Sequence, residues 1–351
     1  MKTYSILLLF VFSFFCSTAC KKKINIIENR AFLSVLEDSK KNEKPIFLIV
    51  GGGSNCIPCV KFKKDIRNSK LLNKYKDHFL FYSCNVNIPE NKFLHKVLLP
   101  FTVPNYYLIQ SDGSVLSFSF YPLDDERIDY ELTSFLKGNT LHYEKHHIFQ
   151  FNTDSILRMQ SLLMQANLKI LSKEYMSALD LVNKSIEIHS YFYNNFLKYQ
   201  IFSKLKDTLH RDSLSQVAYQ YLSANDRQST LFEEDIKEME AVIPTLKNQK
   251  SIIEISRSEI YCKIKANSEQ TFRVKFSNTG NYPIVILNVN STCGCIQLHW
   301  SNKPVLPNDT SNISISFRAN KDAYGKFEQK IKIYSNAINS PSTIKFHGTI
   351  Y

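Results

Sequence analysis

The sequence predicts a multidomain protein of the α/β plus β class, in which an α/β domain, a helical middle segment and a β-sandwich follow one another. Three observations predict this order. Strand-like and helix-like runs alternate over residues 24–140, a helical period free of Gly and Pro extends through residues 155–188, and short runs of alternating polarity fill residues 250–351. A chain of 351 residues is long enough for two or three such domains.

The composition is that of a folded, globular protein. Hydrophobic residues make up 44% of the chain and charged residues 22%, which excludes a disordered chain. The formal net charge is +12, but the basic residues form no compact stripe interleaved with aromatic residues. We therefore expect no nucleic acid among its partners.

The first residues predict a removable export signal. Lys2 precedes an apolar run, residues 6–15, that is too short to span a bilayer well, and small residues lead from it to Cys20. This pattern resembles a bacterial lipoprotein signal, although Ser17 stands where that class usually has Leu. The resemblance implies that residues 1–19 are removed and that Cys20 carries a lipid anchor in the cell envelope, on a membrane facing the periplasm. Three lysines, residues 21–23, then lie against lipid headgroups. An ordinary secretory signal is the alternative.

The α/β segment, residues 24–140, contains a C-x-x-C pair in a specific context. The apolar run Ile46–Val50 is typical of a buried strand, three glycines end it, and Cys56 and Cys59 open the helix-like run that follows. Val103-Pro104 precedes a later strand, and Asp112-Gly113 supplies the turn of a hairpin. A helix-like run closes the segment.

This order resembles the thioredoxin fold, and in particular its exported, membrane-tethered members. The resemblance implies a thiol–disulfide oxidoreductase in which Cys56 is the exposed nucleophile, Cys59 resolves the mixed disulfide and Pro104 is a cis-proline facing both. The dipole at a helix N-terminus stabilises a thiolate at Cys56. Asn55 replaces the Trp of that fold and Val50 replaces its buried acid, so slower turnover is expected. No cofactor is expected.

Two other interpretations of the C-x-x-C pair compete with redox chemistry. The first is a purely structural disulfide. The second is half of a zinc site, which needs two more ligands at suitable spacing, and the chain has no second C-x-x-C.

The middle segment, residues 150–247, is predicted to be helical throughout. Residues 174–205 resemble one degenerate tetratricopeptide-type hairpin, with Tyr175, Ala178 and Ile186 at the usual packing positions. Stable arrays need about three repeats or more, so a plain helical spacer packed on its neighbours is the preferred interpretation.

The last segment, residues 250–351, predicts a β-sandwich. Nearly the whole segment resembles an uncharacterised bacterial family of Hydin-like, immunoglobulin-like domains with a Cys-Gly-Cys motif. The resemblance is carried by residues 276–297, which contain Thr-Cys-Gly-Cys, and by residues 306–317, 324–337 and 344–350. Asn308 stands where that family usually has Gly. The resemblance implies a fold but no activity.

Three interpretations of the Cys-Gly-Cys motif stay open. Cys293 and Cys295 can bond to each other, one of them can pair with Cys262 in another strand, or both can bind a soft ion such as Cu(I). Cys84, on a strand, is most simply a buried free thiol.

The sequence thus favours a membrane-anchored enzyme that exchanges thiols and disulfides with protein substrates. Two rival hypotheses are a non-enzymatic periplasmic scaffold for binding or assembly and a copper-handling protein that uses the Cys-Gly-Cys motif. Reduction of insulin disulfides separates the enzyme from the scaffold, and metal analysis of the purified chain tests the copper hypothesis.

Replacing Cys20 tests the anchor. We expect Cys20→Ala to move the protein from the membrane fraction to the soluble fraction, or to block its maturation, because no other residue of the signal carries lipid. Fractionation followed by immunoblotting measures this. Cys16→Ala, which changes a residue of the removed signal, should leave the distribution unchanged. A Cys20→Ala protein that stays membrane-bound at full yield contradicts the assignment.

Overall fold

The computed structural model describes most of the chain from residue 23 onward. The described residues are 23–51, 56–85, 88–98, 103–120, 122, 124–138, 153–223, 226–227, 230–321 and 323–351. The predicted lipidation residue, Cys20, lies outside them. Among the described helices, none is long and apolar enough to cross a membrane.

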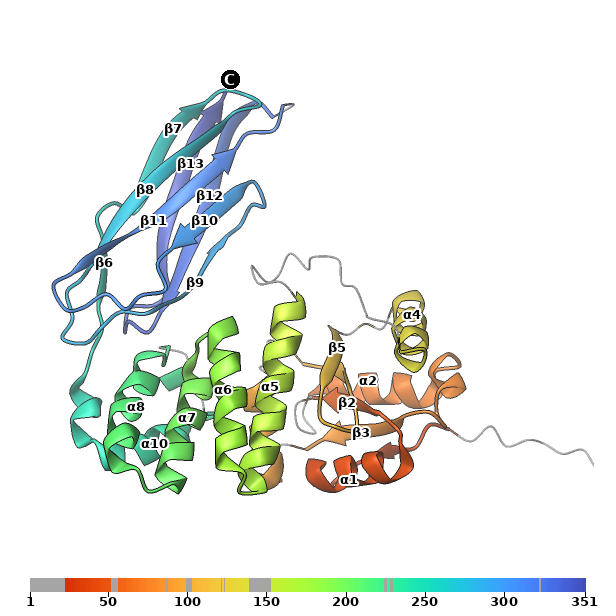
Figure 1. Ribbon diagram of the computed structural model, residues 1–351. Helices are drawn as coiled ribbons and strands as arrows, with labels where there is room; N and C mark the ends of the chain where they lie inside the picture. The colour runs from red at the N-terminus through yellow and green to blue at the C-terminus, as the bar shows by residue number, and fades with distance from the viewer. Residues whose placement is uncertain are drawn as a thin grey trace, which may run out of the picture.

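The N-terminal part is a five-stranded sheet covered by helices on both faces (Figure 1). The strand order is β1-β3-β2-β4-β5, with β3 parallel to β1 and β2, and β4 antiparallel to β2 and β5. The elements are β1 (Ile26–Ile27), α1 (Phe32–Asn42), β2 (Ile46–Val50), α2 (Ile57–Asn68), β3 (Leu80–Cys84), α3 (Lys92–Leu98), β4 (Asn105–Ile109), β5 (Val115–Phe120) and α4 (Asp125–Leu136).

Strand β2 is at the centre of this sheet, and every one of its residues is buried. Successive side chains of a strand point to opposite faces. Leu48 and Val50 accordingly join one core with residues of α1 and α3, whereas Phe47 and Ile49 join another with residues of α2 and α4. The continuous apolar run in the sequence is explained by burial on both faces.

The middle of the chain forms a layer of helices beside this sheet (Figure 1). Helices that are neighbours in sequence pack against each other, from α5 with α6 to α7 with α8. Tyr193 and Phe196, in α7, are buried in the core. The helices are α5 (Thr153–Leu171), α6 (Tyr175–Ile188), α7 (Phe192–Lys204), α8 (Thr208–Gln220) and α10 (Glu233–Val242).

The helical layer and the sheet share one hydrophobic core. The core that contains Leu48 and Val50 continues without interruption through α5, α6, α7, α8 and α10. At the edge strand β5, the hydroxyl of Ser161 on α5 accepts a hydrogen bond from the N–H of Val115 and donates one to its carbonyl, at 2.8 and 3.0 Å. The edge of the sheet is therefore covered by α5 and is closed to another strand there.

A buried ion pair ties α3 to α10. The Lys96 ammonium donates to both carboxylate oxygens of Asp235, at 2.7 and 2.6 Å, and the two side chains are only 11% and 8% exposed. Burial raises the pKa of Asp235, and the Lys96 charge opposes that rise without cancelling it. Desolvation therefore outweighs pairing, and we infer that the pair fixes how α10 docks more than it adds net stability.

The C-terminal part is a β-sandwich that extends away from the helices (Figure 1). Its two four-stranded sheets, ordered β10-β11-β8-β6 and β7-β13-β12-β9, enclose a separate hydrophobic core. In the sequence, six runs are typical of strands: residues 252–256, 271–277, 284–289, 313–319, 330–335 and 343–350. Two of the observed strands, β7 and β10, lie outside these runs. The strands are β6 (Ile253–Ile255), β7 (Glu259–Ile264), β8 (Glu269–Asn278), β9 (Ile286–Ser291), β10 (Ile296–Trp300), β11 (Thr310–Arg318), β12 (Gly325–Ser335) and β13 (Ser342–Ile350).

Tyr282 joins the sandwich to the helices. Its hydroxyl donates to the carbonyl of Gln216 on α8 at 2.8 Å, and its ring meets the ring of Tyr219 edge-on.

The buried ion pair gives the first test of this architecture. We expect Lys96→Met to lower the free energy of unfolding by about 3–5 kcal/mol, because it leaves the Asp235 carboxylate buried and unpaired. Denaturant unfolding of the oxidised protein measures this loss.

Lys92→Met is the matched control. It breaks the neighbouring pair between Lys92 and Glu234, whose side chains are 46% and 74% exposed, and should change stability little because solvent screens an exposed pair. The double variant Lys96→Met/Asp235→Leu should recover most of the loss. Equal effects of Lys96→Met and Lys92→Met would show that α10 is not held by this pair.

Candidate active site

Cys56 and Cys59 form a disulfide at the N-terminus of α2. Cys56 is the N-cap residue, with extended backbone angles, and Cys59 lies in the first turn, so their Cα atoms are 5.3 Å apart. The two environments differ, because Cys56 is half-buried and Cys59 is only 3% exposed. An attacking or attacked sulfur must be reachable from solvent, and only Cys56 meets that requirement.

The first turn of α2 suits a thiolate at Cys56. Pro58 lies in this turn, where the amide N–H groups have no partner within the helix and a missing N–H costs nothing. The turn contains no acidic residue, and the N-cap side chain makes no capping hydrogen bond. The positive end of the helix dipole is therefore directed at Cys56.

Gly51, the residue after β2, sets the position of Cys59. A Cβ atom added at Gly51 would lie 3.2 Å from the Cβ and 3.5 Å from the Sγ of Cys59. A side chain at Gly51 would make this contact tight, and Cys59 or α2 would have to shift by a few tenths of an ångström to relieve it. In the sequence, Gly51 is visible as a strand terminator, but its contact with Cys59 is not.

Pro104 reaches the same end of the sheet. The peptide bond between Val103 and Pro104 is cis. Strand β4 begins at Asn105, which pairs with Val50 in antiparallel register, so Pro104 and Gly51 are the residues that come next at this end of the two strands. The fold thus brings the cysteine pair, Gly51 and Pro104 to one end of the central strand, although 45 positions separate Cys59 from Pro104.

In the described part of the chain, three exposed aliphatic side chains adjoin residues of the site in sequence. Ile57, Val60 and Val103 are 81%, 51% and 39% exposed, and each is next to, or one helical turn from, a residue of the site. Charged side chains begin only one residue beyond Val60, where Lys61 pairs with Asp65 at 2.8 Å.

Cys84 is a buried free thiol, as the sequence predicts. It ends β3 and is in register with Val50 on β2. Burial raises the pKa of its thiol to about 12, and a hydrogen bond with Tyr82 opposes this only weakly. Cys84 therefore stays protonated at neutral pH and cannot act as a nucleophile.

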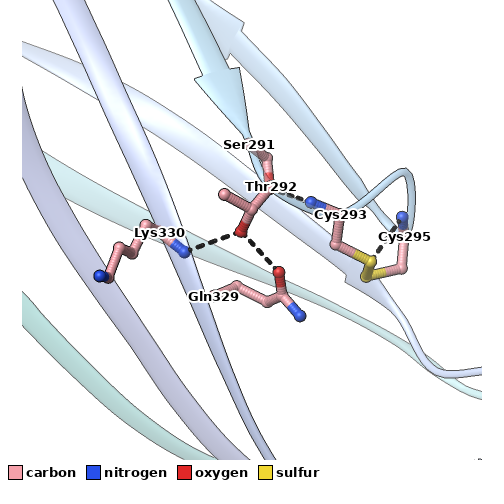
Figure 2. Close-up of a disulfide and its surroundings, with 6 residues drawn as sticks. All are labelled: Ser291, Thr292, Cys293, Cys295, Gln329 and Lys330. Carbon is pink, nitrogen blue, oxygen red and sulfur yellow. Dashed lines mark hydrogen bonds between the residues drawn. A yellow bond between two sulfur atoms is a disulfide. The ribbon is translucent and has the colours of Figure 1, made fainter.

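The Cys-Gly-Cys motif forms a second disulfide, between Cys293 and Cys295 (Figure 2). It lies in the short loop between β9 and β10, at the edge where the chain crosses from one sheet to the other. Thr292 anchors the loop to β12: its hydroxyl donates to the Gln329 side chain at 2.7 Å and accepts the N–H of Lys330 at 3.1 Å.

Cys262 is a free thiol, so the structure does not contain the alternative crosslink between Cys262 and the motif. Its strand, β7, and the strand before the motif, β9, are at opposite edges of one sheet, with β13 and β12 between them. Within the described ranges, no three His, Cys, Asp or Glu side chains are grouped to hold a metal ion.

Comparison with known proteins identifies the sandwich. Residues 253–350 match the family described as "Protein of unknown function (DUF1573)", so the chain ends in a DUF1573 domain. No curated protein matches the chain.

Among solved structures, the chain is similar to a protein of unknown function from Porphyromonas gingivalis W83, at 13% identity and a TM-score of 0.27. The match covers 29% of this chain and 47% of that protein, so this chain matches only about half of its length. A putative disulphide-isomerase from Bacteroides thetaiotaomicron matches 34% of this chain and 97% of its own, at 19% identity and a TM-score of 0.29. A DsbH oxidoreductase matches 33% and 88%, at 20% identity and a TM-score of 0.28.

Gly51 offers a direct test of the packing at the site. We expect Gly51→Ala to lower the free energy of unfolding of the oxidised protein by about 1–3 kcal/mol, because the added methyl group overpacks the contact with Cys59. Thermal or denaturant unfolding measures the change. Gly294→Ala is the control, since a Cβ there meets no atom within 4 Å. If both variants lose the same stability, the contact between Gly51 and Cys59 does not constrain α2.

Proposed function

We propose that the protein is a thioredoxin-like thiol–disulfide oxidoreductase that acts on protein disulfides through Cys56 and Cys59. One observation carries the proposal: the two cysteines form a disulfide at the start of α2, with Cys56 accessible and Cys59 buried. The strand order of the sheet and the cis bond before Pro104 at the same end of the sheet add support.

The chemistry is a two-electron exchange. The Cys56 thiolate attacks one sulfur of a client disulfide, and the other client sulfur leaves as a thiolate. Cys59 then attacks the Sγ of Cys56, the second client sulfur leaves, and the disulfide of the protein forms. The client gains two electrons and two protons, both supplied by the dithiol. Oxidation of a client dithiol is the same sequence in reverse.

The environment of each sulfur fits its proposed role. The N-terminus of α2 stabilises the Cys56 thiolate, which serves as nucleophile in the first step and as leaving group in the reverse direction. Cys59 reacts only with the sulfur bonded to Cys56, because the contact with Gly51 and its low exposure shield it from other partners. Val50, at the end of β2, is apolar, so proton removal from Cys59 depends on water or another base.

The proposed substrates are proteins. The exposed side chains of Ile57, Val60 and Val103 offer apolar contacts beside Cys56, and such contacts favour extended or partly unfolded clients that expose hydrophobic residues. A small soluble thiol would make few of these apolar contacts.

We further propose an envelope location, with the lipid anchor at Cys20 holding a thioredoxin-like domain over residues 24–140 and an immunoglobulin-like domain over residues 250–351. In that arrangement the helical layer acts as a rigid spacer, because its core is continuous with that of the sheet.

Single cysteine variants test the assigned roles. Cys59→Ser should accumulate covalent mixed disulfides with clients, because the intermediate on Cys56 can no longer be resolved, whereas Cys56→Ser should accumulate none. Non-reducing gels with mass spectrometry of the trapped species measure this, and insulin reduction should fall at least about 100-fold in both variants. Equal trapping by the two variants would contradict the assigned roles, and trapping by Cys56→Ser alone would reverse them. Absence of trapping together with an inactive wild-type protein would favour a scaffold.

A further inference from the structure

The disulfide of the Cys-Gly-Cys motif contributes little as a crosslink. A disulfide stabilises a fold mainly by restricting the unfolded chain, and its effect grows with the number of residues that it encloses. Cys293 and Cys295 are two positions apart and enclose only Gly294. A bond that closes so short a segment removes little freedom from the unfolded chain.

Other contacts already hold the loop. The N–H of Thr292 donates to the carbonyl of Lys330 at 3.2 Å, and the N–H of Arg318 donates to the carbonyl of Cys295 at 3.0 Å. The N–H of Ile296 donates to the carbonyl of Cys293 at 3.3 Å and closes the turn between the two cysteines. Both ends of the loop are thus tied to neighbouring strands without the sulfur–sulfur bond.

The two sulfurs have different surroundings. The backbone N–H of Cys295 donates to the Sγ of Cys293 at 3.1 Å (Figure 2). A hydrogen-bond donor favours the charged form of a sulfur, so Cys293 is the better leaving thiolate. Cys295 is then the sulfur that a nucleophile attacks. Both residues are half-buried and Gly294 between them is exposed, so the loop that contains the bond faces solvent.

We propose that Cys293–Cys295 is a second thiol–disulfide exchange centre, which accepts two electrons from a C-x-x-C dithiol, and that the Cys56–Cys59 dithiol of a second copy of this chain is such a donor. The donor role rests on the function proposed above. The helical layer lies between the sheet that carries α2 and the sandwich that carries β9 and β10, which favours transfer between copies over transfer within one (Figure 1).

The step balances without another reagent. The Cys56 thiolate of the donor attacks the Sγ of Cys295, and Cys293 leaves as a thiolate. Cys59 of the donor attacks the Sγ of Cys56, a disulfide forms in the donor, and Cys295 leaves as the second thiolate. The acceptor gains two electrons, and the two protons of the donor dithiol end on Cys293 and Cys295.

Two variants of the mature chain separate donor from acceptor. The donor, Cys293→Ser/Cys295→Ser, is reduced and freed of reductant. The acceptor, Cys56→Ser/Cys59→Ser, is oxidised. Circular dichroism first establishes that both are folded. After mixing, alkylation and peptide mass spectrometry should find the Cys293 and Cys295 thiols of the acceptor and the Cys56–Cys59 disulfide of the donor in equal amounts. Adding Cys59→Ser to the donor should trap one mixed disulfide, between Cys56 and Cys295.

Three controls make the outcomes separable. If the donor reduces insulin but leaves the acceptor oxidised, Cys293–Cys295 does not accept electrons from Cys56–Cys59. The proposed function then stands and the further proposal fails. If the donor fails with insulin too, a purified reduced thioredoxin replaces it, and an acceptor that it reduces keeps the second centre while overturning the donor role of this chain. An acceptor that neither protein nor dithiothreitol reduces while folded overturns the exchange centre altogether. Trapping at Cys293 instead of Cys295 overturns the assigned direction of attack.

Discussion

The hydrophobic core shared by the sheet and the helical layer is the constraint on which the N-terminal two thirds of the molecule depend. One face of the sheet buries Leu48 and Val50 against α1 and α3, and the same core continues through the helices from α5 to α10. The Lys96–Asp235 pair lies inside this contact and specifies its geometry. A polar pair buried so deeply tolerates few alternative arrangements, since any displacement leaves a charge without its partner.

This core determines where chemistry can occur. Helices cover both faces of the sheet, and α5 covers the edge at β5. At the end of the central strand, by contrast, the N-terminus of α2 is accessible to solvent. The disulfide of Cys56 and Cys59 occupies that end. Its asymmetry follows from packing rather than from the two residues themselves, because the backbone of Gly51 holds Cys59 against the strand while Cys56 caps the helix.

The two disulfides lie in different local environments. The first lies in a helical turn whose dipole stabilises one sulfur. The second lies in a loop at a sheet crossing, where a single N–H favours one sulfur as the leaving group. In both cases the cysteines are near neighbours in sequence, so neither bond crosslinks distant parts of the chain. Such short-range pairs suit a protein in which disulfides take part in exchange while the folded core remains unchanged.

The sequence by itself determined the order of the segments, the strand–glycine–C-x-x-C–helix junction, the proline before β4 and the strand character of the last hundred residues. These features depend on local periodicity and turn chemistry, which neighbouring residues encode directly. Only the tertiary structure decided which cysteine is shielded, that Cys293 bonds to Cys295 while Cys262 stays a free thiol, and that the helices share a core with the sheet. Those outcomes depend on contacts between residues far apart in the chain, such as Val50 with Asn105 and Lys96 with Asp235, whose geometry no local pattern contains.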